Sequence, residues 1–305
     1  SSKIINPSYG NDIGEVLYAS KESANTAINA ASEAFKTWSK TGMSYRAELI
    51  LKFRQGVIDK SSEIVDICIK EAGKTKPDAE AELDRAIQAL THASGIQHFY
   101  PAHISRNVAG NIDIADMRYP IGVVAGVGPF NFPILIPILH SSMALVTGNT
   151  HIAKPSEKVP SISRLYADIY KDVGLPDGCY NVINGAKDIV EYIVSHQKVD
   201  GLAFIGSTNA ARSLKSLGVK NNTKVQALGG GKNHMIVLPD ADLDMAADAA
   251  VSASFGAAGQ RCMAVSVVVA VGDIADELVS KIKERIPNIK MGVTDNNDTE
   301  LGPVI

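Results

Sequence analysis

The sequence predicts an α/β protein built on a doubly wound parallel sheet, with a second α/β region after it. Two observations lead to this fold class. From position 121 to position 228, short apolar segments alternate with helical patterns, an arrangement typical of parallel sheets. A glycine run, Gly229–Lys232, then interrupts the chain, and a new strand and helix follow it. We therefore predict a domain boundary near residue 231, between residues 1–231 and residues 232–305.

The composition is that of an ordinary globular protein without a polyanionic partner. Of the 305 residues, 45% are hydrophobic and 21% are charged, and the formal net charge is −3. The lack of a dense Lys/Arg block predicts no nucleic-acid partner, and the lack of an apolar run of roughly 18 residues predicts no membrane span. Three scattered cysteines are too few for a disulfide framework or a metal site of zinc type. This usage favours a reducing compartment, the cytoplasm or, in a eukaryote, the mitochondrial matrix.

The first third of the chain predicts helices, preceded by a strand or hairpin in residues 1–20. Apolar residues recur at helical spacing in four segments, the last of which is broken at Pro101. The segments are 22–38, 45–60, 61–72 and 77–99. Residues 104–117 are turn-rich with some alternation, which predicts an edge strand or a protruding arm.

Residues 121–228 carry the pattern of the parallel sheet. The predicted strands are 121–127, 151–155, 180–183, 199–205 and 223–228, and the predicted helices are 134–145, 161–172, 188–195 and 209–217. Beyond the glycine run, 235–238 and 265–271 predict strands, the second of them buried, and 242–255 predicts a helix with an acidic cap. Ligands of such sheets bind outside the carboxyl ends of the strands, so the loops after the strands are the candidate binding residues.

Three of these loops carry residues suited to chemistry. In PFNFP, Asn131 stands between two aromatics and two prolines, as a rigid amide donor for an oxyanion would. In KPSE, Lys154 and Glu157 could grip a diol such as ribose. In GST, Ser207 stands at a helix N-terminus, a ready anion site. Taken singly, each loop also fits an ordinary capping or charged turn.

A fourth loop holds the candidate nucleophile. In FGAAGQRCM, Cys262 follows a run of Gly and Ala whose small side chains allow a ligand to approach closely. Arg261 beside it favours the thiolate, the form that acts as a nucleophile. By itself such a cysteine is more often a small buried hydrophobe, and only partners elsewhere in the chain favour the catalytic interpretation.

In this order, PFNFP, KPSE, FIGST, GGGKNH and FGAAGQRCM resemble the aldehyde dehydrogenase superfamily through most of its first two domains. The resemblance implies an NAD-binding domain in 1–231, with an oligomerisation arm near 104–119, and the N-terminal part of the catalytic domain in 232–305. It also implies that Cys262 attacks the aldehyde carbon, that Asn131 and the Cys262 amide form the oxyanion hole, and that NAD accepts a hydride.

The cofactor contacts follow from the same resemblance. Lys154 and Glu157 match the residues that hold the adenosine ribose, and a carboxylate there favours NAD over NADP. Lys158 is a candidate contact beside the adenosine, and Ser207 matches a contact on the side of the pyrophosphate. The residues matched to the lining of the cofactor cleft are Gly128, Phe130 and Gly229.

One departure from the family pattern bears on the reaction. Most members carry a general-base glutamate four residues before the lysine that ends the glycine run, and that position here is Leu228. Leucine cannot activate water, so another acceptor should take the acyl group. With KNH and GQRCM, this resembles the CoA-acylating methylmalonate-semialdehyde dehydrogenase branch. The resemblance implies conversion of malonate or methylmalonate semialdehyde to acetyl-CoA or propionyl-CoA, with coenzyme A as co-substrate and loss of carbon dioxide.

The same branch has an arginine before its cysteine and another on an early helix, at positions matching Arg261 and Arg85. Guanidinium groups bind carboxylates bidentately. We therefore expect both arginines to hold the substrate carboxylate. The alternative for Arg85 is a solvated side chain or a pair with Glu82.

Other interpretations stay open on the sequence alone. A dehydrogenase that releases a free acid is disfavoured by Leu228, and a cysteine hydrolase would need a histidine partner for Cys262. The family usually runs well past Ile305, so we expect the chain to be the ordered part of a longer protein or a fragment, in which case it would be an inactive NAD-binding module. The family resemblance implies a homotetramer, a dimer of dimers.

Overall fold

The computed structural model of the protein describes residues 1–100 and 102–305, so the break predicted at Pro101 lies outside the described residues. Its strands are β1 (Ser2–Ile5), β2 (Asp12–Val16), β3 (His103–Ser105), β4 (Ile114–Asp116), β5 (Val123–Val127), β6 (Thr150–Lys154), β7 (Tyr180–Val182), β8 (Gly201–Ile205), β9 (Lys224–Leu228), β10 (Asn233–Val237) and β11 (Val265–Ala270). Its helices are α1 (Lys21–Trp38), α2 (Met43–Asp59), α3 (Ser61–Ala72), α4 (Lys76–Ser94), α5 (Ile96–Phe99), α6 (Leu135–Val146), α7 (Ser161–Asp172), α8 (Lys187–Ser195), α9 (Thr208–Lys220), α10 (Leu243–Phe255) and α11 (Ala275–Arg285).

The central feature is the predicted parallel sheet, with strand order β7-β6-β5-β8-β9. The chain runs outward from β5 through β6 to β7 and then crosses back to the other side of β5 for β8 and β9. The direction of winding therefore reverses between β5 and β8, and in doubly wound sheets this reversal opens a crevice at the carboxyl ends of the strands. The predicted fold class is confirmed.

Helices cover both faces of the sheet and bury two apolar cores. One core joins α2, α3, α4, α6 and α7, with Phe53, Leu90 and Tyr166 fully buried in it. The other joins α1, α8 and α9 to the strands, around Ile28, Ile152 and Ile193. Burial on both faces explains why the central strand β5 is a continuous apolar run, whereas β9, at the edge of the sheet, alternates between exposed and half-buried residues.

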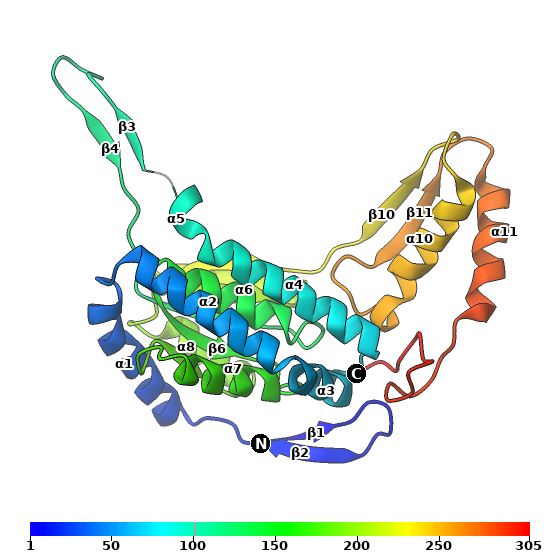
Figure 1. Cartoon of the computed structure of the whole chain (residues 1–305), viewed down its shortest axis with the longest axis horizontal. Coiled ribbons are helices and arrows are strands. Elements are labelled where there is room, and N and C mark those ends of the chain that lie inside the picture. The colour runs from blue at the N-terminus through cyan, green and yellow to red at the C-terminus, as the bar shows by residue number, and fades with distance from the viewer. Residues whose placement is uncertain (101) are drawn as a thin grey trace.

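Two parts of the chain extend away from this body (Figure 1). One is the antiparallel hairpin of β3 and β4, which exposes Ile104, Ile114 and Tyr119 to solvent. It is the protruding arm expected for residues 104–117. The helix expected over 77–99 is two helices, α4 and α5, which meet at Gly95, the C-cap of the first.

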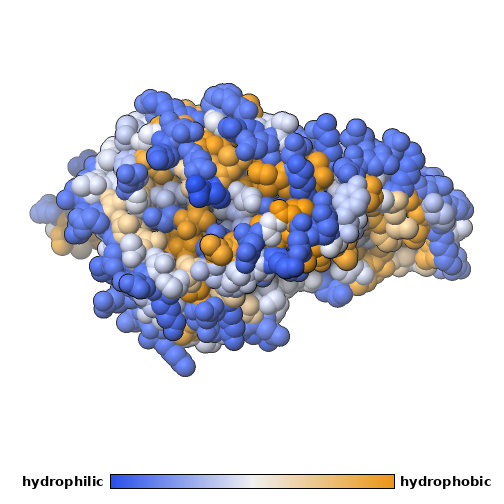
Figure 2. Space-filling view, turned by 90° about the horizontal axis from the view of Figure 1, so that it is seen from below, coloured by the Kyte–Doolittle hydropathy of each residue, from blue (hydrophilic) through white to orange (hydrophobic). Residues whose placement is uncertain are grey.

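The second extension is a separate parallel pair, β10 and β11, covered on one side by α10 and α11. Asp242 caps α10 as predicted, and its side chain accepts hydrogen bonds from the amides of Asp244 and Met245. The expectation of a buried strand over 265–271 was wrong, because β11 is only half-buried and Val269 is exposed. A two-stranded sheet with helices on one side leaves its other side open, and Figure 2 shows apolar side chains at the surface toward this end of the molecule.

The last residues of the chain return to the first. Ser8 and Thr294 are joined through their hydroxyls at 2.9 Å, and the Tyr9 hydroxyl donates to Asp295 at 2.6 Å. The sheets therefore change between β9 and β10, near the predicted boundary, but residues beyond 290 pack against the N-terminal region. Within the described residues, no helix is both long and apolar enough to cross a membrane.

Candidate active site

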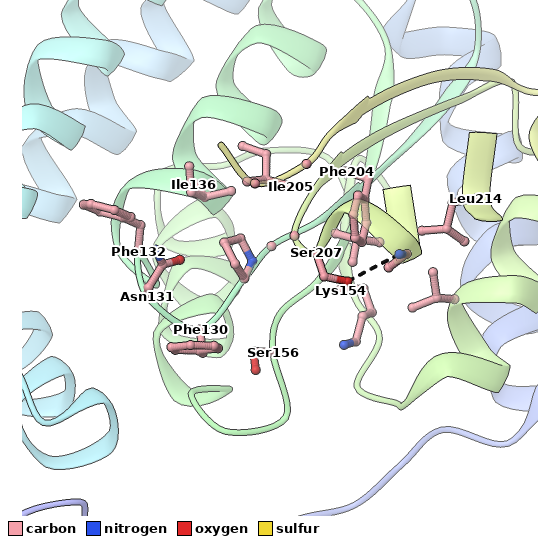
Figure 3. Close-up of a pocket in the computed structure, with 18 of the residues that line it drawn as sticks. Phe130, Asn131, Phe132, Ile136, Lys154, Ser156, Phe204, Ile205, Ser207 and Leu214 are labelled. Atoms are coloured by element: carbon pink, nitrogen blue, oxygen red, sulfur yellow. Dashed lines mark hydrogen bonds between the residues drawn. The ribbon is translucent and has the colours of Figure 1, made fainter. Parts of the chain in front are cut away.

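A cavity of about 840 Å³ lies at the carboxyl ends of β5, β6 and β8, where the winding of the sheet reverses. Its walls come from the loops after these strands, the starts of α8 and α9, and the loop that carries Cys262. Figure 3 shows Phe130 and Asn131 on one side of the cavity, with Ser207 and Leu214 on the other. The predicted site residues that line it are Gly128, Phe130, Asn131, Lys154, Glu157, Ser207, Gly229, Arg261 and Cys262.

Asn131 links the first domain to the cysteine loop. Its Nδ2 donates a hydrogen bond of 2.8 Å to the carbonyl oxygen of Gln260, two residues before Cys262. An asparagine amide carries two N–H groups, so this bond leaves one of them for a ligand. The bond also brings the predicted oxyanion donor and the predicted nucleophile, which are far apart in the chain, to the same cavity wall.

A buried ion pair supports the loop that contains Asn131. Lys74 Nζ lies 2.6 Å from Glu82 Oε2 and 4.3 Å from the centroid of the Phe132 ring. The other carboxylate oxygen of Glu82 accepts hydrogen bonds from the amides of Ile134 and Leu135, at 2.7 and 2.8 Å, at the N-terminus of α6. Burial raises the pKa of the Glu82 carboxyl, while Lys74 and the two amides oppose that rise. The pair therefore holds Phe132 and the start of α6 in place.

Lys154 and Glu157 stand together on the floor of the cavity. Lys154 is buried at the end of β6, and its Nζ lies 3.5 Å from Glu157 Oε2. Burial lowers the pKa of the Lys154 ammonium group, and Glu157 opposes that shift. The pair offers donors and acceptors for sugar hydroxyls. Lys158 is not part of the cavity lining, and its Nζ stacks over the Phe130 ring, 5.2 Å from the centroid.

The start of α9 forms the opposite wall. The Ser207 hydroxyl caps the helix by accepting a hydrogen bond of 3.3 Å from the Ala210 amide (Figure 3). A Cβ on Gly229 would lie only 3.0 Å from Thr208, so a glycine lets the end of β9 pass close to this helix. Amides at a helix N-terminus and the positive end of the helix dipole favour an anion such as a phosphate.

The loop before Cys262 adopts an unusual backbone conformation. Ala257 and Ala258 have φ angles of 51° and 54°, in the left-handed region. That region costs a residue with a Cβ about 1–2 kcal/mol and persists only where the surrounding structure enforces it. Cys262 itself is exposed and lines the cavity.

Asp78, in the first turn of α4, holds this loop at two points. Its Oδ2 accepts a hydrogen bond of 3.1 Å from the Ala257 amide, and its Oδ1 pairs with the Arg261 guanidinium. That guanidinium packs against Gly256, where any Cβ would clash with it.

Asn233, the first residue of β10, holds the other end of the loop. Its Nδ2 donates to the carbonyl oxygens of Cys262 and Ala264 at 2.9 and 3.0 Å. The backbone on both sides of the thiol is therefore bound to its surroundings.

Arg85 lies outside the cavity. It lines a separate hollow of about 440 Å³ between α4 and α6, with Leu135 and Leu139. Its Nη1 donates to Gln88 at 3.2 Å, whereas Glu82, the partner expected from the sequence, pairs with Lys74. Arg261 and Arg85 are thus not brought to a single site.

Sequence reasoning missed the residues that support the site. Asp78 stands three residues after the helix cap Thr75, a spacing that predicts only a capped helix start. Its contact with Arg261, 183 residues later, has no local signal. Asn233 lies inside the GGGKNH motif, and an asparagine just before a predicted strand is a signal for an anchor to the neighbouring strand.

Leu228 ends β9 next to the cavity-lining Gly229 and is half-exposed. Ala227 before it also lacks a proton acceptor. The end of β9 therefore offers no general base.

Comparison with known proteins extends these observations. The chain matches the aldehyde dehydrogenase family over residues 1–305. It is 38% identical over 302 residues to a malonate-semialdehyde dehydrogenase of Bacillus pumilus, an alignment that covers 99% of this chain and 62% of that protein. It thus spans less than two thirds of the length of this relative.

Solved structures of dehydrogenases of this family superpose closely on the chain. The methylmalonate-semialdehyde dehydrogenase of Oceanimonas doudoroffii superposes with a TM-score of 0.97 at 40% identity, over 100% of this chain and 62% of that one. The betaine aldehyde dehydrogenase of Staphylococcus aureus in complex with NAD+ superposes with a TM-score of 0.96 at 28% identity, over 100% of this chain and 61% of that one.

Proposed function

The chain belongs to the aldehyde dehydrogenase family, and we propose that it supplies the cofactor site and the nucleophile for NAD-dependent oxidation of malonate or methylmalonate semialdehyde. One observation carries the proposal. The loop of Cys262 and the amide of Asn131 meet at the wall of a cavity that lies at the winding reversal of the parallel sheet. The names of the Bacillus and Oceanimonas relatives support the choice of substrate class.

The cavity has the donor set that NAD requires. The buried Lys154 ammonium and the Glu157 carboxylate suit the two hydroxyls of a ribose, and the capped N-terminus of α9 at Ser207 suits a pyrophosphate. Glu157 would repel a 2′-phosphate, which favours NAD over NADP. NAD, when bound, supplies an acceptor for a hydride.

In the reaction we propose, the Cys262 thiolate attacks the aldehyde carbon and forms a carbon–sulfur bond. The carbonyl oxygen becomes an oxyanion, which accepts hydrogen bonds from the second N–H of Asn131 and from the Cys262 amide. When the hydride leaves the carbon, the carbonyl is restored as a thioester on Cys262. The side chains of Asp78 and Asn233 keep the backbone of the nucleophile in place during these steps.

The acyl group then passes to coenzyme A rather than to water. This part of the proposal rests on Leu228 and Ala227, which provide no base to activate water at the end of β9. A malonyl thioester loses its carboxylate as carbon dioxide and takes up a proton, and the methyl homologue does the same. The CoA thiolate then attacks the acyl carbon, releases the Cys262 thiolate and leaves as acetyl-CoA or propionyl-CoA.

We assign the substrate carboxylate to Arg261 and Arg85. Arg261 lines the cavity with a third of its side chain exposed, so its guanidinium can donate hydrogen bonds to a second carboxylate besides that of Asp78. Arg85 lines the separate hollow between α4 and α6 and donates to Gln88, so it would have to leave Gln88 and turn toward the cavity to reach the same carboxylate. Replacing either arginine with Leu should raise KM for malonate semialdehyde and spare propanal. Equal effects on both aldehydes would exclude this role.

The test of the proposed reaction is NADH formation from malonate semialdehyde by this chain, with and without coenzyme A. We expect turnover to require CoA and to yield acetyl-CoA and carbon dioxide. Turnover to a free acid without CoA would contradict the acylating reaction. Loss of all turnover in Cys262→Ala but not in Cys179→Ala, a buried cysteine, would support the assignment of the nucleophile.

A further inference from the structure

We infer that Asp78 is a positioning residue that sets the conformation of the nucleophile loop, defined here as residues 256–262. The inference deepens the proposed function, since the importance of the loop rests on the role of Cys262. Asp78 touches no residue of the proposed cofactor contacts Lys154, Glu157 and Ser207, and it acts through the backbone and Arg261.

Asp78 uses both carboxylate oxygens on the loop. One oxygen accepts a hydrogen bond from the Ala257 amide and the other from the Arg261 guanidinium. Asp78 therefore binds the loop at two points, five residues before Cys262 and directly before it. The Asp78 side chain is 17% exposed and that of Arg261 is 33% exposed, which leaves the pair partly shielded from water and strengthens it relative to a surface ion pair.

This grip offsets a conformational cost. Ala257 and Ala258 both lie in the left-handed region, which alanine leaves readily when nothing holds it. The Ala257 amide, bound to Asp78, belongs to the first of these residues. Without the carboxylate, the strain of two adjacent alanines would favour relaxation of the loop and displacement of Cys262 from the cavity wall.

Helix α4 connects Asp78 to the rest of the site through a second carboxylate, that of Glu82. Glu82 lies one helical turn after Asp78 on the same face and binds the amides that begin α6, just after Asn131. The nucleophile loop and the Asn131 loop are thus attached to neighbouring carboxylates of one helix. The hydrogen bond from Asn131 to the Gln260 carbonyl also joins the two loops directly, so each loop is bound both to α4 and to the other loop.

The test uses hydrogen exchange of the folded chain, which needs no turnover. Asp78→Asn keeps an acceptor for the Ala257 amide and loses the ion pair, whereas Asp78→Ala loses both. Asp84→Asn removes an exposed carboxylate of the same helix and serves as the matched control. The informative amides are those of Ala257 and of Gln260, which donates to the Ala257 carbonyl.

We expect exchange of these two amides to be roughly tenfold faster in Asp78→Asn and roughly a hundredfold faster in Asp78→Ala, with the control and the urea midpoint unchanged. Unchanged exchange in Asp78→Ala would overturn the inference. Faster exchange throughout the chain with a lower midpoint would also overturn it, because Asp78 would then support the fold as a whole.

Steady-state kinetics separate this inference from the proposed function. Where the unaltered chain turns over, Asp78→Ala should lower kcat with the KM for NAD unchanged, and Asp78→Asn should recover part of the loss. An equal loss in both variants, or a raised KM for NAD alone, would count against positioning. Absence of turnover in the unaltered chain would count against the proposed function, while the exchange experiment would still decide the role of Asp78.

Discussion

The Lys74–Glu82 pair should be one of the most costly polar interactions in the protein to break. Both side chains are almost fully buried, at 6% and 1% exposed, and their charged atoms lie 2.6 Å apart. In Glu82→Gln, the Gln oxygen can still accept from the Ile134 and Leu135 amides. Its NH₂ group, however, would face the Lys74 ammonium, donor against donor. The substitution therefore removes the charge and leaves the start of α6 capped.

The expected cost follows from the burial. Removing one partner of a buried ion pair leaves the other charge uncompensated, at about 3–5 kcal/mol. Glu80→Gln is the matched control, because Glu80 pairs with Lys76 on the same helix at 3.8 Å with both side chains about half-exposed. Its loss should stay within about 0.5 kcal/mol. Lys74→Met combined with Glu82→Gln should cost less than the sum of the two single changes, since neither charge then remains.

The free energy of unfolding can be measured by urea titration monitored by the fluorescence of Trp38, which is buried in the same core as α4. The reasoning would be refuted if Glu82→Gln lowered the free energy of unfolding by less than about 1 kcal/mol, or by no more than Glu80→Gln does. An ion pair whose loss costs so little cannot be buried away from water as described. Additive effects in the double variant would show that the two charges do not interact.

Three further predictions concern stability, cofactor choice and assembly. Burial lowers the pKa of His151 from 6.5 to about 3, so the unfolded chain binds more protons below pH 6.5. Between pH 6.5 and about pH 3, His151 therefore contributes a fall in the free energy of unfolding of about 1.4 kcal/mol for each pH unit. Burial also lowers the pKa of His140, to about 4, so His151→Leu should roughly halve the slope of urea-derived stability between about pH 7 and pH 5. An unchanged slope would exclude His151 as one of its sources. Glu157→Gln should tighten NADP binding roughly tenfold relative to NAD, as measured by quenching of protein fluorescence, and an unchanged preference would remove Glu157 from the ribose site. We propose that the β3–β4 arm joins copies of the chain into a dimer of dimers. Ile104→Lys combined with Ile114→Lys, at two exposed positions of the arm, should then lower the molar mass measured by light scattering. An unchanged mass would place the contact elsewhere.

Much of the fold could be predicted because its signals are local. Most strands of the parallel sheet are short segments that end directly before a Gly or Pro, and the order of strands and helices follows from their alternation with helical patterns. The strand β11 was predicted, but its partial exposure could not be, since a run of valines indicates a strand without showing how many layers cover it. Helix α11 was missed because it buries only Leu278 and is otherwise highly charged.

The candidate site divides in the same way. Asn131, Lys154, Ser207 and Cys262 stand in loops whose sequences stand out on their own, and they line one cavity. Asp78 could not be found from sequence, because an acidic residue in the first turn of a helix is usually there for the helix dipole. The left-handed conformation of the loop alanines could not be predicted either, since alanine favours the right-handed helix and the partners of the loop, Asp78 among them, lie far away in the sequence.

The most direct test of the central claim is mass spectrometry of the peptide that contains Cys262 after the chain is mixed with malonate semialdehyde and NAD. The account predicts an acyl group on Cys262 that persists without coenzyme A and disappears when CoA is added, and that does not form in Cys262→Ser. An acyl group that hydrolyses equally fast without CoA, or one found on Cys68 or Cys179 instead, would contradict it.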